Sequence, residues 1–292
     1  MACLQDIRRR IRSVKNTQQV TKAMKMISAV KLRKSKERLL VFQPYSNKMA
    51  ETVKNLVKCC QDDTQVQLYP VVQACIAPRE ERNIKLIVIA SDKGLCGGFN
   101  ANVLKQATTF VSNCKCNVVH LDVVGKRAVE WANKHGYKID KDYIGVSLPN
   151  LAHMAEEISS KAVEQYELGE IDALYVAYNY FGSALTQIPM IQRVFPIEVD
   201  SAKEEKSSEK PYLLEPSPAI VLSTLLSRFL ETTFLRVLLE SSASEHGARM
   251  AAMDKASINA EDMIARLTLN MNKVRQAAIT NQIIEIVSGA NA

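Results

Sequence analysis

Near the end of the sequence, about 70 consecutive residues contain one internal glycine, Gly247, and no proline after the first position. Ser217 is a suitable helix N-cap, Pro218 suits the first helical position, and Gly289 is expected to end the run. A helix rises 1.5 Å per residue, so this run predicts a rod of roughly 105 Å. A compact domain of a 292-residue chain cannot enclose such a rod, and we expect part of it to project.

The beginning of the sequence predicts a second long helix. Residues 3–58 contain no glycine and one proline, Pro44, which is expected to bend the helix near residues 40–43. The first apolar residues follow the 3-4-3 spacing of a coiled-coil seam: Leu4, Ile7, Ile11 and Val14. The pattern weakens at three polar residues and then resumes: Thr17, Gln18 and Thr21, followed by Met24, Ile27 and Val30. This gap predicts a stutter or local unwinding.

The C-terminal run divides into two parts of different character. Residues 219–239 are apolar nearly all round and are expected to lie against a central domain. The charges within this part argue against a membrane span. Beyond it, apolar residues keep a heptad-like spacing: Met253, Ala256, Ala260, Met263, Leu267, Val274 and Ala277. Because the two long helices lie at opposite ends of the chain, they are expected to form an antiparallel coiled coil.

The middle of the chain alternates strand and helix patterns. Strands are expected at 84–90, 118–124 and 173–178, with an edge strand at 188–199. Helices are expected from Ala101, at 126–134 and at 151–168, and the polar run 200–211 is interpreted as a linker. This alternation predicts a Rossmann-like α/β domain with a mostly parallel sheet. We therefore divide the chain into three parts. Residues 1–60 form the N-terminal helix of the coiled coil, residues 61–210 the central α/β domain, and residues 211–292 the C-terminal helix of the coiled coil.

The charge of the chain is concentrated at its beginning. Residues 1–60 hold fifteen Lys or Arg against three acidic residues, a balance of +12, so the other residues sum to −5 of the net +7. A basic arm of this kind favours an acidic partner, which could be nucleic acid, lipid or protein. The seven cysteines lack the spacing of a disulfide framework or metal site, and we interpret them as structural or incidental thiols in a reducing compartment.

The segment Ser91–Asn100 (SDKGLCGGFN) lies between an expected strand and an expected helix. Its spacing matches neither a phosphate-binding loop nor a dinucleotide-binding fingerprint, so a tight turn at Gly94, Gly97 and Gly98 is the better interpretation. Cys96 as a nucleophile is less probable than a partly buried spectator thiol. The four histidines show no ligand spacing, and no arrangement of residues adds up to a catalytic, cofactor or metal site.

Four segments resemble one protein family, the gamma subunit of F-type ATP synthases. Residues 11–26 (IRSVKNTQQVTKAMKM) look like its N-terminal helix, and SDKGLCGGFN looks like its central turn. Residues 244–253 (SEHGARMAAM) and 272–290, which include the stretch NKVRQAAIT, resemble its C-terminal helix. The four segments occur in the family's order and span nearly the whole chain.

The resemblance implies a non-catalytic central-stalk rotor. In that family the paired helices turn inside a hexameric ring of alpha and beta subunits, and the α/β domain sits against the epsilon subunit and the ring of c subunits. The membrane is reached only through the c-ring, and nucleotide chemistry occurs on beta. Because the match begins near Leu4, the resemblance indicates a bacterial protein on the cytoplasmic side of the plasma membrane.

The resemblance also implies which residues contact the beta subunit. Matched position by position, these are Met24, Arg275, Gln276 and Thr280, together with Gln282. The family usually has Glu where this chain has Gln282, so a role of that carboxylate is in doubt here.

Two other hypotheses remain open on the residues alone. One is a basic, coiled-coil, nucleic-acid-associated protein, although residues 1–41 contain no aromatic side chain for base stacking. The other is an α/β enzyme that uses the Gly94 turn.

Overall fold

The computed structural model describes residues 4–59, 72–73, 80–114, 118–145, 147–197, 214–215 and 218–290. The chain separates into two compact units. One unit, here called the helix-pair unit, consists of residues 1–30 and 249–292, and the other, the sheet unit, consists of residues 31–248. Each unit therefore contains part of both long helices. The expected linker 200–211 and Ser217 lie outside the described residues.

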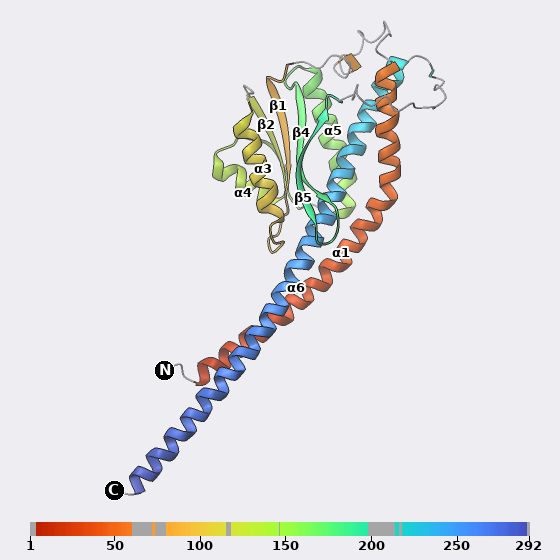
Figure 1. Cartoon of the computed structure of the whole chain (residues 1–292). Coiled ribbons are helices and arrows are strands. Elements are labelled where there is room, and N and C mark those ends of the chain that lie inside the picture. The colour runs from red at the N-terminus through yellow and green to blue at the C-terminus, as the bar shows by residue number, and fades with distance from the viewer. Residues whose placement is uncertain are drawn as a thin grey trace. The chain divides into compact units, whose positions relative to one another are not determined.

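The two expected long helices are present (Figure 1). Helix α1 runs over Leu4–Cys59 and continues through Pro44, and helix α6 runs over Pro218–Ala290. The sequence had suggested that α6 ends at Gly289, but the helix extends one residue further, to Ala290. One glycine weakens a helix by only about 1 kcal/mol and does not block it. No helix in the described ranges is long and apolar enough to cross a membrane.

The sheet unit is built on five strands in the order β3-β2-β1-β4-β5. The strands are β1 (Asn83–Ile89), β2 (Val118–Val124), β3 (Ile139–Tyr143), β4 (Ala173–Phe181) and β5 (Gln187–Phe195). β1 pairs in parallel with β2 and β4, and β2 pairs in parallel with β3, whereas β5 is antiparallel to β4. The mostly parallel Rossmann-like sheet and its edge strand near residue 188 are thus confirmed.

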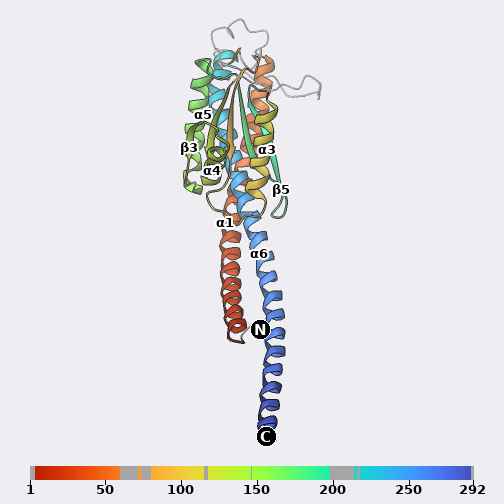
Figure 2. The ribbon, with the colours of Figure 1, turned by 90° about the vertical axis from the view of Figure 1, so that its left-hand side faces the viewer.

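Helices cover both faces of this sheet (Figures 1 and 2). On one face lie α3 (Phe99–Asn113) and α4 (Lys126–His135), which share an apolar core with the sheet that includes Val88, Val103 and Trp131. On the other face lies α5 (Leu151–Glu167), preceded by a 3-10 turn at Leu148–Asn150. The first half of α6 and the second half of α1 join the core on that second face.

The apolar first half of α6 packs as its composition predicted. Leu222, Leu226, Leu230 and Phe234 are at most 2% exposed and belong to the same core cluster as Ile87 of the sheet. Each of these side chains contributes about 1.5–3 kcal/mol when it is fully withdrawn from water. This packing holds the second half of α1 and the first half of α6 against the sheet.

The cysteines differ from the prediction at one position. Cys96 is a buried free thiol, but Cys114 at the end of α3 is disulfide-bonded, so the expectation of incidental thiols is wrong there. The spacing of cysteines in a sequence does not show which sulfur atoms the fold brings together. Among the described residues, no group of His, Cys, Asp or Glu is arranged to hold a metal ion.

Candidate functional site: the helix pair and the central turn

In the helix-pair unit, α1 and α6 are joined by polar contacts at the seam. The Thr21 and Ser257 hydroxyl oxygens are 2.8 Å apart, and Lys25 Nζ lies 2.6 Å from Asp254 Oδ1. The α6 partner number falls as the α1 number rises, so the helices run antiparallel. The seam also buries Ile7, Met253 and Ala260, each at most 8% exposed. Small side chains at such positions let two helix axes approach closely.

The hydroxyl pair is more constrained than one distance suggests. Thr21 Oγ1 also lies 2.9 Å from the Gln18 carbonyl oxygen, and Ser257 Oγ lies 2.8 Å from the Met253 carbonyl oxygen. The two hydroxyls therefore make three close oxygen–oxygen contacts: one with each other and one with each carbonyl oxygen. Because each hydroxyl has a single proton to donate, at most two of these three contacts are hydrogen bonds at one time. In the sheet unit the same two helices make a further contact of this kind, with Ser35 Oγ 3.2 Å from Ser242 Oγ.

The predicted stutter in α1 does not occur. The more buried positions continue in an unbroken 3-4 spacing along the helix: 4, 7, 11, 14, 18, 21, 25, 28, 32, 35 and 39. Ile27 and Val30, which were assigned to the seam, are both 58% exposed. The sequence pattern was misread because Thr21, Ser28 and Ser35 occupy buried seam positions, where apolar residues were expected. Extending the spacing of residues 4–14 without a break would have given the correct register.

The α6 side of the seam was assigned with similar errors. Met253 and Ala260 are buried, and Leu267 and Val274 are half-buried, as predicted, but Met263 is 46% exposed and Ala277 is also exposed. Ser257 and Ile264 lie nearer the partner helix than Ala256 and Met263 do. The register of α6 was assigned wrongly for the same reason as that of α1: Ser257 is a buried seam residue, and a search for apolar residues does not include serine.

The residues that the resemblance assigned to a beta-subunit contact occupy two places in this unit. Met24 is half-buried beside Lys25 on α1, whereas Arg275, Gln276, Thr280 and Gln282 are exposed on α6. The α6 residues from Asp254 to Arg275 rise roughly 30 Å, so the two places are well separated along the helix. Within the second group, Thr280 Oγ1 donates a hydrogen bond to the Gln276 carbonyl oxygen at 2.9 Å.

Within the part of the chain that the structure describes, the last turns of α6 have no helix beside them. Val274 is the last half-buried residue, and every residue from 275 to 289 is exposed. Several of these are large and apolar, among them Ile279, Ile283 and Ile286, which are 48%, 55% and 71% exposed. A single helix of this length is only marginally stable in water, and exposed apolar residues mark interaction surfaces. This end of α6 is therefore suited to being enclosed by another protein.

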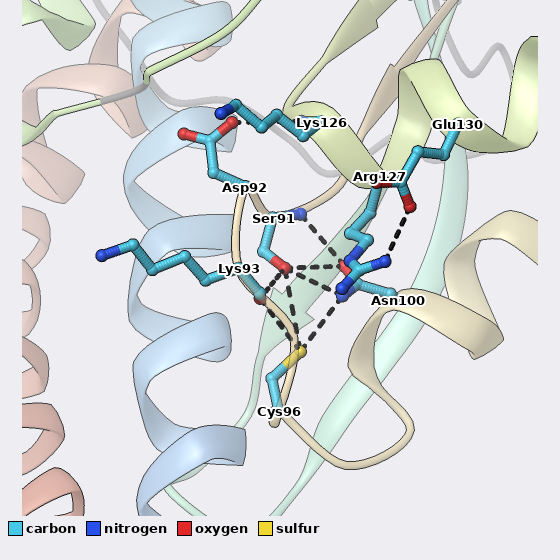
Figure 3. A network of polar contacts seen from close by, with 8 residues as sticks. All are labelled: Ser91, Asp92, Lys93, Cys96, Asn100, Lys126, Arg127 and Glu130. Carbon is cyan, nitrogen blue, oxygen red and sulfur yellow. Dashed lines mark hydrogen bonds and ion pairs between the residues drawn. The ribbon is translucent and has the colours of Figure 1, made fainter.

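The central turn of the sheet unit is held by side chains (Figure 3). Ser91 Oγ lies 2.7 Å from the Lys93 carbonyl oxygen, and Asn100 Oδ1 accepts the Ser91 backbone N–H at 3.0 Å. Asn100 Nδ2 donates to Cys96 Sγ at 3.2 Å. Asp92 Oδ1 accepts the backbone N–H of Lys126 at 3.0 Å and so caps the start of α4. These contacts give the side chains of Ser91, Asp92, Cys96 and Asn100 a structural role within the turn.

The glycines of this turn serve different geometric needs. Gly97 has a φ of 58°, in the left-handed region, whereas a Cβ at Gly94 or Gly98 would meet a side-chain nitrogen at 3.2 or 3.1 Å. The exposed Leu95 also has a positive φ, 63°, which is uncommon for a residue with a side chain. Sequence reasoning missed Gly125, where φ is 90° and a Cβ would lie 2.3 Å from the Ala90 carbonyl oxygen. A lone glycine between an expected strand and helix was the available signal.

The sheet unit also buries an ion pair that the sequence did not indicate. Lys85 Nζ lies 2.7 Å from Asp122 Oδ2 and 2.6 Å from Gln165 Oε1, and the two charged side chains are at most 1% exposed. Burial lowers the pKa of Lys85, while the nearby Asp122 carboxylate opposes that change. Burial likewise raises the pKa of Glu240, against the attraction of Arg236. None of these groups lies beside a catalytic arrangement, so we interpret them as parts of the fold.

Comparison with known proteins decides the family. A family model described as ATP synthase matches residues 3–292. The ATP synthase gamma chain of Heliobacterium modesticaldum is 40% identical over all of this chain and 99% of the relative's length, and that of an Anaeromyxobacter strain is 43% identical with the same coverage. The chain belongs to the ATP synthase gamma chain family.

Solved structures of mitochondrial ATP synthases contain chains with a similar fold. A Euglena gracilis mitochondrial ATP synthase structure titled OSCP/F1/c-ring contains a chain with a TM-score of 0.67 and 18% identity, covering 99% of this chain and 94% of that one. A Tetrahymena thermophila structure titled central stalk/cring gives a TM-score of 0.57 and 21% identity, covering 82% and 99%. At these identities the likeness concerns the fold alone.

Proposed function

We propose that this gamma chain is the central-stalk rotor subunit of an F-type ATP synthase. In this role it couples ion-driven rotation of a ring of c subunits to the nucleotide states of catalytic beta subunits, without carrying out chemistry itself. The observation that carries the proposal is the identity of 40–43% to ATP synthase gamma chains over the full length of the chain.

The physical features of the chain support this role. A rotor needs a stiff part that turns as a body, and paired helices resist bending because bending one of them unpacks the other. The exposed end of α6, with its apolar side chains, suits enclosure in a ring of partner subunits. Titles of the similar Euglena and Tetrahymena structures name a rotor, an F1/c-ring assembly and a central stalk.

The partners follow from the same proposal. The helix pair is expected to turn inside a hexamer of alpha and beta subunits, and the sheet unit to contact an epsilon subunit and the c-ring. The named curated relatives are bacterial proteins, which supports a position at the cytoplasmic side of a bacterial plasma membrane, reached through the c-ring. The nucleic-acid hypothesis has no support from these relatives.

Within this role, Arg275, Gln276, Thr280 and Gln282 would meet the beta subunit from the exposed end of α6, and Met24 would meet it from α1. Charged and amide side chains on an unpaired helix are available for hydrogen bonds to a partner. Residue 282 offers an uncharged amide here, so it would bring no charge of its own to a hydrogen bond with the beta subunit.

Replacement of Arg275 and Gln276 by alanine tests this assignment. Because both residues are exposed, we expect the isolated chain to keep its thermal stability within about 0.5 kcal/mol. ATP-driven ion uptake by the assembled complex should fall relative to ATP hydrolysis. The matched control replaces Asn133 and Lys134, an exposed amide and cation on α4, by alanine. Equal coupling in both variants would contradict the proposed contact.

Isolation of the complex from native membranes tests the role as a whole. The gamma chain should copurify with alpha, beta and epsilon subunits and with the c-ring in a fixed ratio. Recovery of the chain with nucleic acid, or by itself, would overturn the proposal.

A further inference from the structure

β5 forms an open edge of the five-stranded sheet. Within the described residues it pairs with β4 alone, and Figure 2 shows it at one side of the sheet unit. Pro189, opposite Asn179, has no N–H to give to the ladder, so its backbone nitrogen faces outward. Positions two residues apart in a strand point the same way, and Ile191, opposite Ala177, therefore directs its N–H and C=O outward as well.

This edge is bordered by a cavity on each face of the sheet. On the α3 face, a cavity of about 530 Å³ is lined by Pro189 and Ile191 together with Gln106 and Phe110 of α3. On the other face, a cavity of about 500 Å³ lies between β5 and the long helices. Ile191 lines both cavities. An extended strand laid along β5 would alternate its side chains between these two spaces.

The two cavities differ in charge. The one on the α3 face is lined by three apolar residues, Phe110, Pro189 and Ile191, and by polar residues of α3, of which Lys105 alone is charged. The one toward the long helices is lined by three basic residues, Lys54, Arg193 and Arg236, and by no acidic residue. Two of these have carboxylate partners behind the wall, since Arg193 Nη2 is 3.1 Å from Glu81 Oε1 and Arg236 Nη1 is 3.1 Å from Glu240 Oε1. Lys54 is exposed and forms no ion pair with another described residue.

We propose that the β5 edge binds an extended, acidic segment of another subunit by strand addition. The segment would pair its backbone with the outward groups of Pro189 and Ile191. It would place acidic side chains toward Lys54 and Arg236, and apolar ones toward α3. This mode of binding uses backbone hydrogen bonds for affinity and flanking pockets for specificity. The inference rests on the proposed function, because the segment is sought within the ATP synthase complex.

Pro189 sets the register of such a strand. It can accept a hydrogen bond through its carbonyl oxygen but donates none, which protects the isolated edge against indiscriminate pairing. Ile191 and Arg193 are the next outward residues along β5, and each has both a donor and an acceptor for the added strand. The amide of Ile191, which lies beside both cavities, reports directly on the proposed contact.

Amide hydrogen exchange at residues 187–195 tests the inference. In the isolated chain the Ile191 amide should exchange rapidly, and in the complex from native membranes it should exchange at least about tenfold more slowly, the effect of about 1.4 kcal/mol. Copurification with alpha and beta separately reports on the proposed function. A chain that assembles while Ile191 still exchanges at its free rate overturns this inference alone, whereas a chain that fails to assemble overturns both.

Two pairs of variants separate backbone pairing from side-chain contacts. Ile191→Pro removes the outward N–H without breaking the β4 ladder, and Ile191→Ala keeps that N–H but loses the side chain. The proline variant should abolish the protection that the complex gives to the outward Arg193 amide, whereas the alanine variant should retain most of it. Lys54→Glu should weaken protection more than Lys34→Glu on an exposed part of α1. Equal protection in all four variants would overturn the proposal.

Discussion

The sheet unit and the helix-pair unit are stabilised by different kinds of contact. The sheet unit has two apolar cores, in which side chains such as Ile87, Phe234 and Trp131 are closely surrounded. The helix-pair unit relies on a narrow seam in which hydroxyls and an ion pair stand beside few apolar residues. A core of large side chains stabilises a domain without help from a partner, whereas a narrow seam leaves much of the helix surface free to contact partners. This difference fits a chain whose sheet unit folds by itself and whose helix-pair unit is enclosed by other subunits.

The largest effect should come from the buried ion pair of the sheet unit. Asp122→Ala leaves the buried Lys85 without its ion-pair partner, though still hydrogen-bonded to Gln165, and we expect a loss of about 3–5 kcal/mol in the free energy of unfolding. Denaturant unfolding followed by tryptophan fluorescence measures the loss, since Trp131 lies in this unit. Glu130→Ala is the control, because its ion pair with Arg127 is exposed and should contribute less than about 1 kcal/mol. Similar losses in both variants would contradict the role assigned to burial.

An intermediate effect is expected at the seam of the helix-pair unit. Ala260 is 8% exposed, so Ala260→Leu should overpack the seam and cost about 1–3 kcal/mol. Faster amide exchange in residues 4–30, with the sheet strands unchanged, would locate the effect. Met263→Leu serves as the control because Met263 is 46% exposed and lies outside the seam. An unaltered helix pair in the Ala260 variant would show that the seam runs elsewhere.

The smallest effect concerns the hydroxyl pair. Ser257→Ala removes one partner of Thr21 and should destabilise the helix pair by about 1 kcal/mol. Adding Thr21→Val should recover most of that loss, because replacing both polar partners by apolar groups of similar shape is nearly neutral. Thermal unfolding of both variants by circular dichroism measures the difference. A double variant that is less stable than the single one would contradict this expectation and would show that the Thr21 hydroxyl stabilises the helix pair by itself.

The sequence predicted the elements of the sheet unit better than the register of the helix pair. Glycine and proline punctuation, together with apolar runs such as IKLIVI, located most strands and helices to within a few residues. β3 was missed because its sequence, IDKDY, carries three charges at an edge of the sheet. Long-range partners such as Lys85 and Asp122 depend on strand order, which local patterns do not contain.

The candidate site on the helix pair could be predicted only in part for a related reason. The resemblance pointed to Arg275 and Gln276, and the structure places both on exposed helix. The contact between α1 and α6 reaches only as far as Val274, and the residues of α6 beyond it are exposed. The position of this limit depends on how far the two helices are offset along each other, which no local sequence pattern shows. The hydroxyls of Thr21 and Ser257, 2.8 Å apart, mark this offset, and periodicity arguments based on apolar residues pass over them.

The central claim is that α1 and α6 turn together as one body in the assembled complex. A disulfide between Thr21→Cys and Ser257→Cys, at positions whose hydroxyl oxygens are 2.8 Å apart, tests it directly. With the native cysteines accounted for by the singly substituted variants, ATP-driven ion uptake is compared before and after oxidation. The account predicts equal uptake in the oxidised and reduced complexes. Loss of uptake on oxidation, restored by reductant, would show that the two helices must move apart and would contradict it.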